Sequence, residues 1–271
     1  MSWMKRLDQA RRGYRDQDSE LSSAAHDPAA IAQAVHGKPE EHGGLGSEYL
    51  GEIVYGGLDG IITTFAVVSG VAGAELGTGV ILIMGLANLF ADGFSMATGA
   101  YLSNKSEQEF YDKERARESW EVENYPQGEK AELHELYLAS GYSEQEAGQL
   151  VEIITGDNER WVDAMMIDEL GLMRDERKPL LNALATLLAF ILFGSTPLII
   201  YLLELLVEVP AGIRFPLSLG LSGAALFGLG AAKVRVTHQN PLRSGIEMLL
   251  VGGLAAGVAY VVGAMLKGIG A

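Results

Sequence analysis

The chain has 271 residues, no cysteine and a formal net charge of −15. The lack of cysteine excludes disulfides and thiolate metal sites, and the negative charge argues against nucleic acid as a partner while it suits cations. Acidic and apolar residues are separated along the chain, because residues 105–177 hold 20 Asp and Glu against 8 Lys and Arg, whereas residues 215–232 and 248–266 hold no charge.

Residues 1–47 form the first segment, which the sequence predicts to be a disordered cytosolic tail. Polar and small residues dominate it, and apolar residues show little periodicity. Its first fifteen residues are basic and also contain Trp3, Met4 and Leu7. Two interpretations remain open for them: an exposed basic terminus, or a helix that lies on an anionic membrane surface.

Five apolar segments follow, each long enough to cross a hydrocarbon core of about 30 Å at 1.5 Å per residue. They are predicted at about residues 53–74, 78–103, 179–207, 215–234 and 246–266. Glycine is frequent in the first, fourth and fifth, which favours close packing of membrane helices. The expected fold is all-α, an integral membrane protein with five transmembrane helices. The expected domains are 1–47, 48–104 with spans one and two, a helical insert at 105–177, and 178–271 with spans three to five.

The basic residues predict the orientation. One set of connections carries Lys105, Arg174, Arg177, Lys178, Lys233, Arg235 and Arg243, whereas the opposite set carries only Arg214. Because positive loops stay in the cytosol, the amino terminus and the insert are expected there. A short chain without an organelle signal indicates a prokaryotic plasma (inner) membrane.

The insert reads as four helices. Residues 105–124 lack glycine and proline and are expected to continue the second span, and residues 125–128 give a turn signal. A second helix is predicted at 128–140. Ser143 and Glu146 form a capping box for a third helix through about Thr155. The fourth begins at Asp157 or Asn158 and is expected to end at Gly171.

One carboxylate interrupts each of the first two spans. Asp59 lies in the first span and Asp92 in the second, four residues after Asn88 and therefore on the same helix face. Met96 is one turn further along. Charges at this depth are costly and usually face a cavity or a partner, so this stripe is a candidate ion path. The alternatives are a solvated Asp59 near the interface and a Met96 that only fills the core.

A second set of candidate ligands lies in the insert. Glu107, Glu114, Glu118 and Glu121 share one helix face, Glu129 and Glu132 are three residues apart on the next helix, and Met165, Met166 and Glu169 lie on the fourth. If these faces converge, their repulsion requires a cation, and the thioethers favour a transition metal over Mg²⁺ or Ca²⁺. A solvated acidic helix is the alternative.

An enzyme is not expected. A ferritin-like di-iron centre would use Glu-x-x-His on two helices, and the nearest pattern is Glu132–Leu133–His134, which has the wrong spacing. The chain shows no nucleophile motif, phosphate loop or zinc signature.

Four motifs together resemble the vacuolar iron transporter family, which includes nodulin-like plant and prokaryotic members. They are Tyr55–Gly60, Ala91–Ala97, Tyr101–Glu107 and Met165–Leu172. The resemblance covers about residues 48–268 and implies five spans, a homodimer in lipid and a cytosolic metal-binding insert. It implies export of Fe²⁺, often Mn²⁺, from the cytosol in exchange for protons.

The resemblance also assigns residues. Asp59 and Met96 match the metal and proton path, and Glu52 matches an acidic position near its entrance. The ligands that it implies in the insert are Glu118, Glu121, Glu129, Glu132, Met165, Met166 and Glu169. Asn88 departs from the family, whose plant-type members usually carry glutamate there, and Asp92 lies one turn away.

The expected function is a proton-coupled Fe²⁺/Mn²⁺ exporter in which the metal is a substrate and no cofactor is permanently bound. The alternative is a membrane-anchored metal sensor or buffer, in which the spans serve only as an anchor. Asp59 and Asp92 distinguish the two, because an anchor has no use for charges within its spans.

Overall fold

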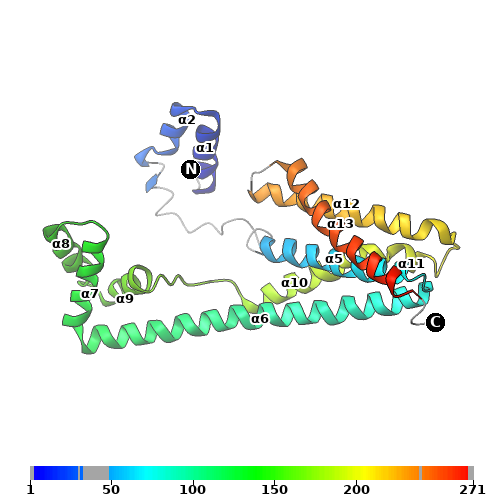
Figure 1. Cartoon of the computed structure of the whole chain (residues 1–271). Helices are drawn as coiled ribbons and strands as arrows, with labels where there is room; N and C mark the ends of the chain where they lie inside the picture. The colour runs from blue at the N-terminus through cyan, green and yellow to red at the C-terminus, as the bar shows by residue number, and fades with distance from the viewer. Residues whose placement is uncertain (1–2, 30, 33–48, 238–239, 268–271) are drawn as a thin grey trace.

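The computed structural model describes residues 3–29, 31–32, 49–237 and 240–267, and all regular structure in these ranges is helical. Five helices are long and apolar enough to cross a membrane, which confirms the predicted number for this part of the chain. They are α5 (Leu50–Gly73), α6 (Thr78–Asn124), the segment Pro179–Leu203, α12 (Ala211–Thr237) and α13 (Pro241–Met265). The spans bundle at one end of the molecule, and the insert lies at the other (Figure 1).

Helix α5 is the centre of the bundle and packs against α10 (Pro179–Gly194), α13, α6 and α12. Glycine makes these approaches possible. A Cβ on Gly60 would clash with the backbone of Phe190 in α10, and one on Gly263 in α13 would clash with the backbone of Gly70. Small residues therefore bring α5 into backbone contact with neighbours on two sides, as expected for membrane helices that lack a hydrophobic driving force.

The third span differs from the prediction of one helix over 179–207. It consists of α10, a 3₁₀ turn at Thr196–Leu198 and α11 (Ile199–Leu203). Pro197 has no N–H to continue the helix, and its carbonyl instead accepts a buried hydrogen bond of 2.7 Å from the Ser218 hydroxyl. Glu204 lies just past α11, where the Arg214 guanidinium contacts it at 2.7 Å.

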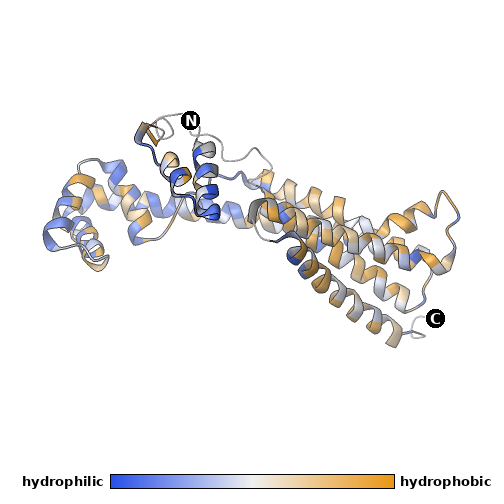
Figure 2. Ribbon diagram, turned by 90° about the horizontal axis from the view of Figure 1, so that it is seen from above, coloured by the Kyte–Doolittle hydropathy of each residue, from blue (hydrophilic) through white to orange (hydrophobic). Residues whose placement is uncertain are grey.

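Helix α6 continues without a break from the membrane bundle into the insert, as predicted, and its 47 residues span about 70 Å. Hydrophobic residues dominate the bundle and hydrophilic ones the insert (Figure 2). Helices α7 (Pro126–Ala139), α8 (Glu144–Ile154) and α9 (Asn158–Ala164) complete the insert. The predicted capping box of Ser143 and Glu146 is present.

The fourth insert helix is shorter than predicted, because α9 gives way to a π-helical turn at Met165–Glu169 before Gly171 ends the segment with a positive φ of 65°. Leu133, Trp161, Met165 and Met166 are among the buried residues of the insert's apolar core.

The amino-terminal segment also differs from the expected disordered tail. Helices α1 (Trp3–Asp16) and α2 (Ser19–Ala25) pack against each other. Asp18 caps α2, and the buried Arg6 donates a hydrogen bond of 3.3 Å to the carbonyl of Ala25. A cap and a close crossing at Gly13 thus compensate for the weak apolar pattern. Residues 33–48 of the predicted tail lie outside the described residues.

Candidate metal site and membrane path

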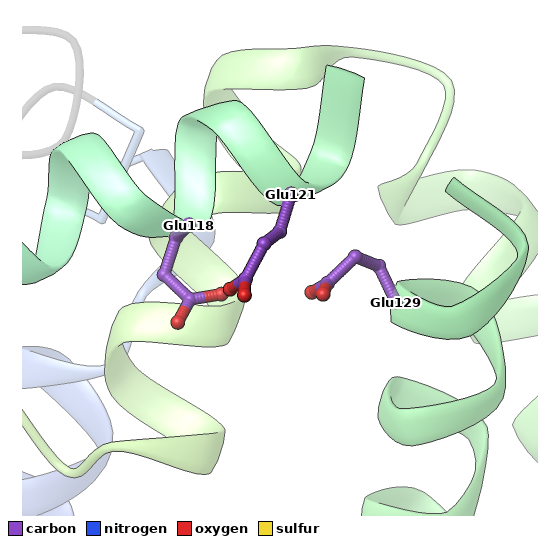
Figure 3. Close-up of side chains that lie close together, drawn as sticks. All are labelled: Glu118, Glu121 and Glu129. Atoms are coloured by element: carbon purple, nitrogen blue, oxygen red, sulfur yellow. The ribbon is translucent and has the colours of Figure 1, made fainter. Parts of the chain in front are cut away.

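Three carboxylates converge where α6 meets α7. Glu118 and Glu121 lie one turn apart near the end of α6, and Glu129 lies in the first turn of α7. The turn at Tyr125 and Pro126 reverses the chain, so that Glu129 points into the gap that the α6 side chains also face (Figure 3). One oxygen from each carboxylate lies within 4.8 Å of the other two, a spacing that a single metal ion could bridge.

A second group shares Glu129 with the first. Oxygens of Glu129, Glu132 and Glu169 also lie within 4.8 Å of one another. Glu129 is buried, whereas Glu132 and Glu169 are exposed. The structure thus brings together all five carboxylates that the resemblance assigned to the insert, as two overlapping clusters.

The buried members of these clusters lack hydrogen-bond donors. Glu118 is fully buried, and neither of its carboxylate oxygens has a hydrogen-bond partner; one oxygen of Glu129 is also buried without a partner. A buried anion without donors is costly unless it becomes protonated or binds a cation. Glu118 and Glu129 can therefore be stabilised either by protonation or by a bound cation.

The pKa values reflect the same electrostatics. Burial first, and then the charge of Glu169, raise the pKa of Glu118 to about 7. Burial and the charge of Glu118 raise the pKa of Glu129 to about 7. Burial and Glu132 raise the pKa of Glu169. Near neutral pH, protons and metal ions therefore compete for the same oxygens.

Two glutamates of the predicted acidic face lie outside both clusters. Glu107 lies about three turns before Glu118 in α6, where it accepts a hydrogen bond of 3.3 Å from Ser103. Glu114 accepts one of 3.0 Å from Arg117. Arg117 was not among the predicted site residues, although its spacing of three from Glu114 and four from Glu121 is the spacing of helical ion pairs.

Met165 and Met166 are fully buried in the apolar core of the insert, on the π-helical turn that also carries Glu169. Single-turn π-helices are frequent at functional sites. The burial gives both methionines a packing role, and their role as soft ligands stays a prediction.

The predicted membrane residues are spread along two helices. Asp59 on α5 and Asp92 on α6 are each half-buried and close enough that their charges interact. Asn88 is half-buried, and its Nδ2 has no hydrogen-bond partner. Met96 packs against the apolar core of the bundle.

Met96 and Glu52 line a common cavity of about 460 Å³, here named the membrane cleft. Its lining residues from α5, α6, α10 and the segment before α10 are Glu52, Tyr55, Met96, Gly99, Ala100, Ser103, Asn104, Glu107, Arg177, Asn182 and Thr186. Asn104 and Asn182 are more than nine-tenths buried, and the side-chain oxygen of each lacks a hydrogen-bond partner. No sequence motif indicated these two amides.

A cationic side chain lies at the membrane cleft. The Arg177 guanidinium contacts Glu52 at 2.8 Å and Asp175 at 2.8 Å. Asn104 donates a hydrogen bond of 2.9 Å to the carboxylate of Asp175, and Gln108 donates one of 3.0 Å to the backbone carbonyl of Asp175. These bonds fasten the end of the insert to α6 and hold Arg177 against Glu52.

The chain matches known proteins over most of its length. The model of the VIT family matches residues 50–264. The chain belongs to this family. A vacuolar iron transporter of Toxoplasma gondii is 38% identical over 267 residues, covering 96% of this chain and 88% of the relative. One of Plasmodium falciparum is 33% identical, covering 97% of each chain. Vacuolar iron transporter 1 of Arabidopsis thaliana is 33% identical, covering 79% of this chain and 84% of the relative.

Membership of the VIT family confirms the predicted family. The relatives are named as transporters, which agrees with the prediction that the chain is not an enzyme. Their names place them in vacuoles and their sources are apicomplexan parasites and plants, so they give no support to the prediction of a prokaryotic plasma membrane.

Proposed function

We propose that this VIT-family chain transports Fe²⁺ across a membrane and uses the insert to collect the ion. The observation that carries the proposal is the convergence of Glu118, Glu121 and Glu129, in which both oxygens of Glu118 and one oxygen of Glu129 are buried without a hydrogen-bond partner. These ligands lie on or beside the same helix that lines the membrane cleft and carries Asp92. The named iron transporters among its relatives support iron as the substrate.

The direction of transport is proposed to be out of the cytosol. The basic residues that flank the insert and the connection between α12 and α13 support a cytosolic insert and amino terminus. An ion collected by the insert enters the membrane cleft past Glu52 and Met96 and then reaches Asp59. Carboxylate and thioether ligands suit Mn²⁺ as well as Fe²⁺, so Mn²⁺ is proposed as a second substrate.

Proton coupling follows from the same carboxylates. A carboxylate in a cavity within the membrane is favourable when it binds either a metal ion or a proton. We therefore propose that protons moving inward neutralise Asp59 and Asp92 and release the metal on the far side. Each carboxylate binds the two cations in alternation.

A homodimer is proposed as the working unit. Large apolar side chains of α5 and α6 are exposed in the single chain, among them Tyr55, Ile83, Phe90 and Phe94. Asp59 and Asp92 are only half-buried within one chain. A second copy packed against α5 and α6 would shield these charges from lipid, whereas lipid itself could not.

Flux into proteoliposomes tests this function. Purified protein should move Fe²⁺ and Mn²⁺ faster than Zn²⁺ or Co²⁺. An acidic vesicle interior should accelerate the uptake, because protons then leave as the metal enters. A membrane-anchored sensor or buffer would bind metal without any flux. Metal binding combined with no flux under either gradient would contradict transport and favour that alternative.

A further inference from the structure

A single arginine already occupies part of the proposed metal site. The three nitrogens of the Arg117 guanidinium each face a different carboxylate: Nε lies 3.0 Å from Glu114, Nη1 2.6 Å from Glu121 and Nη2 2.5 Å from Glu118. The contacts to Glu114 and Glu121 have hydrogen-bond geometry, whereas the one to Glu118 is an ion pair only, because both Glu118 oxygens lack a hydrogen-bond partner. The positive charge thus lies against two proposed ligands without satisfying the buried one.

The three partners of Arg117 are not equivalent. Glu118 and Glu121 belong to the first carboxylate cluster, whereas Glu114 belongs to neither cluster within the described residues. The Arg117 side chain is 42% exposed, so it has room to move. Glu114 lies three residues before Arg117 on the same helix and holds the Nε atom, away from the two nitrogens that face the cluster.

We propose that Arg117 is a tethered competitor of the metal ion. In the empty site it compensates the charges of Glu118 and Glu121, and a bound cation displaces it so that it pairs with Glu114 alone. This inference rests on the proposed function, because it requires that Glu118, Glu121 and Glu129 bind metal.

The physical reason is the conflict between two cations. A guanidinium and a divalent ion that share the same carboxylates repel each other, and in a partly buried site the repulsion is weakly screened. Metal binding must therefore overcome the loss of the Arg117 contacts. The affinity is lower than the number of carboxylates would give, which suits a site that must release its ion to a transport path. The planar fork of arginine reaches three carboxylates at once, which the point charge of lysine does not.

The chain offers a matched control two residues away. Arg115 contacts Glu159 at 2.6 Å and Asp163 at 2.5 Å, and neither of these belongs to the clusters. Arg115→Gln removes the same charge from the same helix without freeing a proposed ligand.

The experiment is titration of the purified full-length protein with Mn²⁺ at slightly alkaline pH, with free Mn²⁺ followed by electron paramagnetic resonance. Arg117→Gln should bind at least about tenfold more tightly than wild type. Arg117→Lys should lie between the two, and Arg115→Gln should match wild type. Guanidinium ion at non-denaturing concentration should weaken binding to Arg117→Gln more than to wild type, because it can fill the vacated position.

The outcomes separate this inference from the proposed function. If wild type binds Mn²⁺ and Arg117→Gln binds equally or more weakly while its circular dichroism and melting curve are unchanged, Arg117 only positions the glutamates and the inference is wrong. If Arg117→Gln misfolds, Arg117→Lys is the deciding variant. The inference is wrong if Arg117→Lys does not bind Mn²⁺ more tightly than wild type. If neither wild type nor any variant binds Mn²⁺, both the competitor role and the proposed function fail.

Discussion

The carboxylates of the insert and those of the spans are arranged in opposite ways. In the insert, two helix ends and a π-helical turn of one chain bring five glutamates into two overlapping groups of three, and Glu118 is completely buried. In the spans, Asp59 and Asp92 remain half-buried on helices whose large apolar side chains face outward. The proposed insert site therefore takes all its carboxylates from one chain, whereas the proposed membrane path leaves Asp59 and Asp92 partly exposed.

Both regions nevertheless hold an arginine against a proposed ligand. Arg117 contacts Glu118 and Glu121 in the insert, and Arg177 contacts Glu52 in the membrane cleft. The comparison suggests that collection and translocation are separable steps, each with its own carboxylates and its own competing cation.

The largest effect is expected from Asp59→Asn. The amide keeps the volume of the side chain but removes its charge, so the ion loses its ligand in the membrane and transport should be abolished. Mn²⁺ binding by the insert of the same purified variant should equal that of wild type. Undiminished flux in proteoliposomes would show that Asp59 is not on the path.

A loss of about one hundredfold in metal affinity is expected from Glu129→Gln, because Glu129 is the one carboxylate shared by both clusters. The measurement is Mn²⁺ titration of the full-length protein. Glu152→Gln on the exposed face of α8 is the control and should leave the affinity unchanged. An equal loss in both variants would point to general surface charge instead of a site.

A fall in metal affinity of up to about tenfold per pH unit is expected for each of the two titrating carboxyls of the insert. Because the pKa values of Glu118 and Glu129 are raised to about 7, both bind protons in the empty folded protein below that pH. Metal affinity should fall as pH decreases through 7, and ion binding just below it should release protons. Titrations in buffers of different ionisation enthalpy measure that release. A pH-independent affinity would contradict the raised values.

The same titration predicts the stability of the empty protein. In the unfolded chain both carboxyls have ordinary pKa values near 4.5, so between that pH and about 7 the folded state binds more protons than the unfolded state. The stability contribution of these groups is therefore present at low pH and is lost as pH rises through 7. Thermal melts with and without Mn²⁺ should diverge most at alkaline pH.

The smallest effect, a few-fold change in transport, is expected from Arg177→Gln. Removing the guanidinium frees Glu52, which should lower the metal concentration for half-maximal flux. Arg174→Gln, in the same segment, is the control. If Mn²⁺ binding by the insert is unchanged in both variants, the effect on flux arises in the membrane cleft. If Arg177→Gln changes Mn²⁺ binding by the insert, the two regions are not separable.

The spans were predictable because length and composition alone determine them. The break in the third span was not predicted, because a proline can kink a helix or end it, and its surroundings, here the Ser218 hydroxyl bonded to the Pro197 carbonyl, come from another span. Helix α6 was predicted through Asn124 because no glycine or proline interrupts residues 105–124.

The candidate site was only partly predictable for a different reason. Spacing indicated that Glu118 and Glu121 share a face, but whether Glu129 meets them depends on the angle of the turn at Tyr125 and Pro126, which no periodicity reports. The ion pairs of Arg117 could have been found from helical spacing. The unpartnered side-chain oxygens of Asn104 and Asn182 could not, since their burial arises from packing between helices.

The unbroken length of α6 has a consequence for how ions reach the membrane. Glu118 and Met96 lie 22 residues apart on this one helix, which fixes them about 33 Å from each other. No side chain bridges such a gap, so an ion cannot pass from ligand to ligand while it remains coordinated. On the proposed path it must dissociate from the insert and diffuse to the cleft. The rigid helix thus makes release from the insert and entry into the cleft two separate steps of the proposed path.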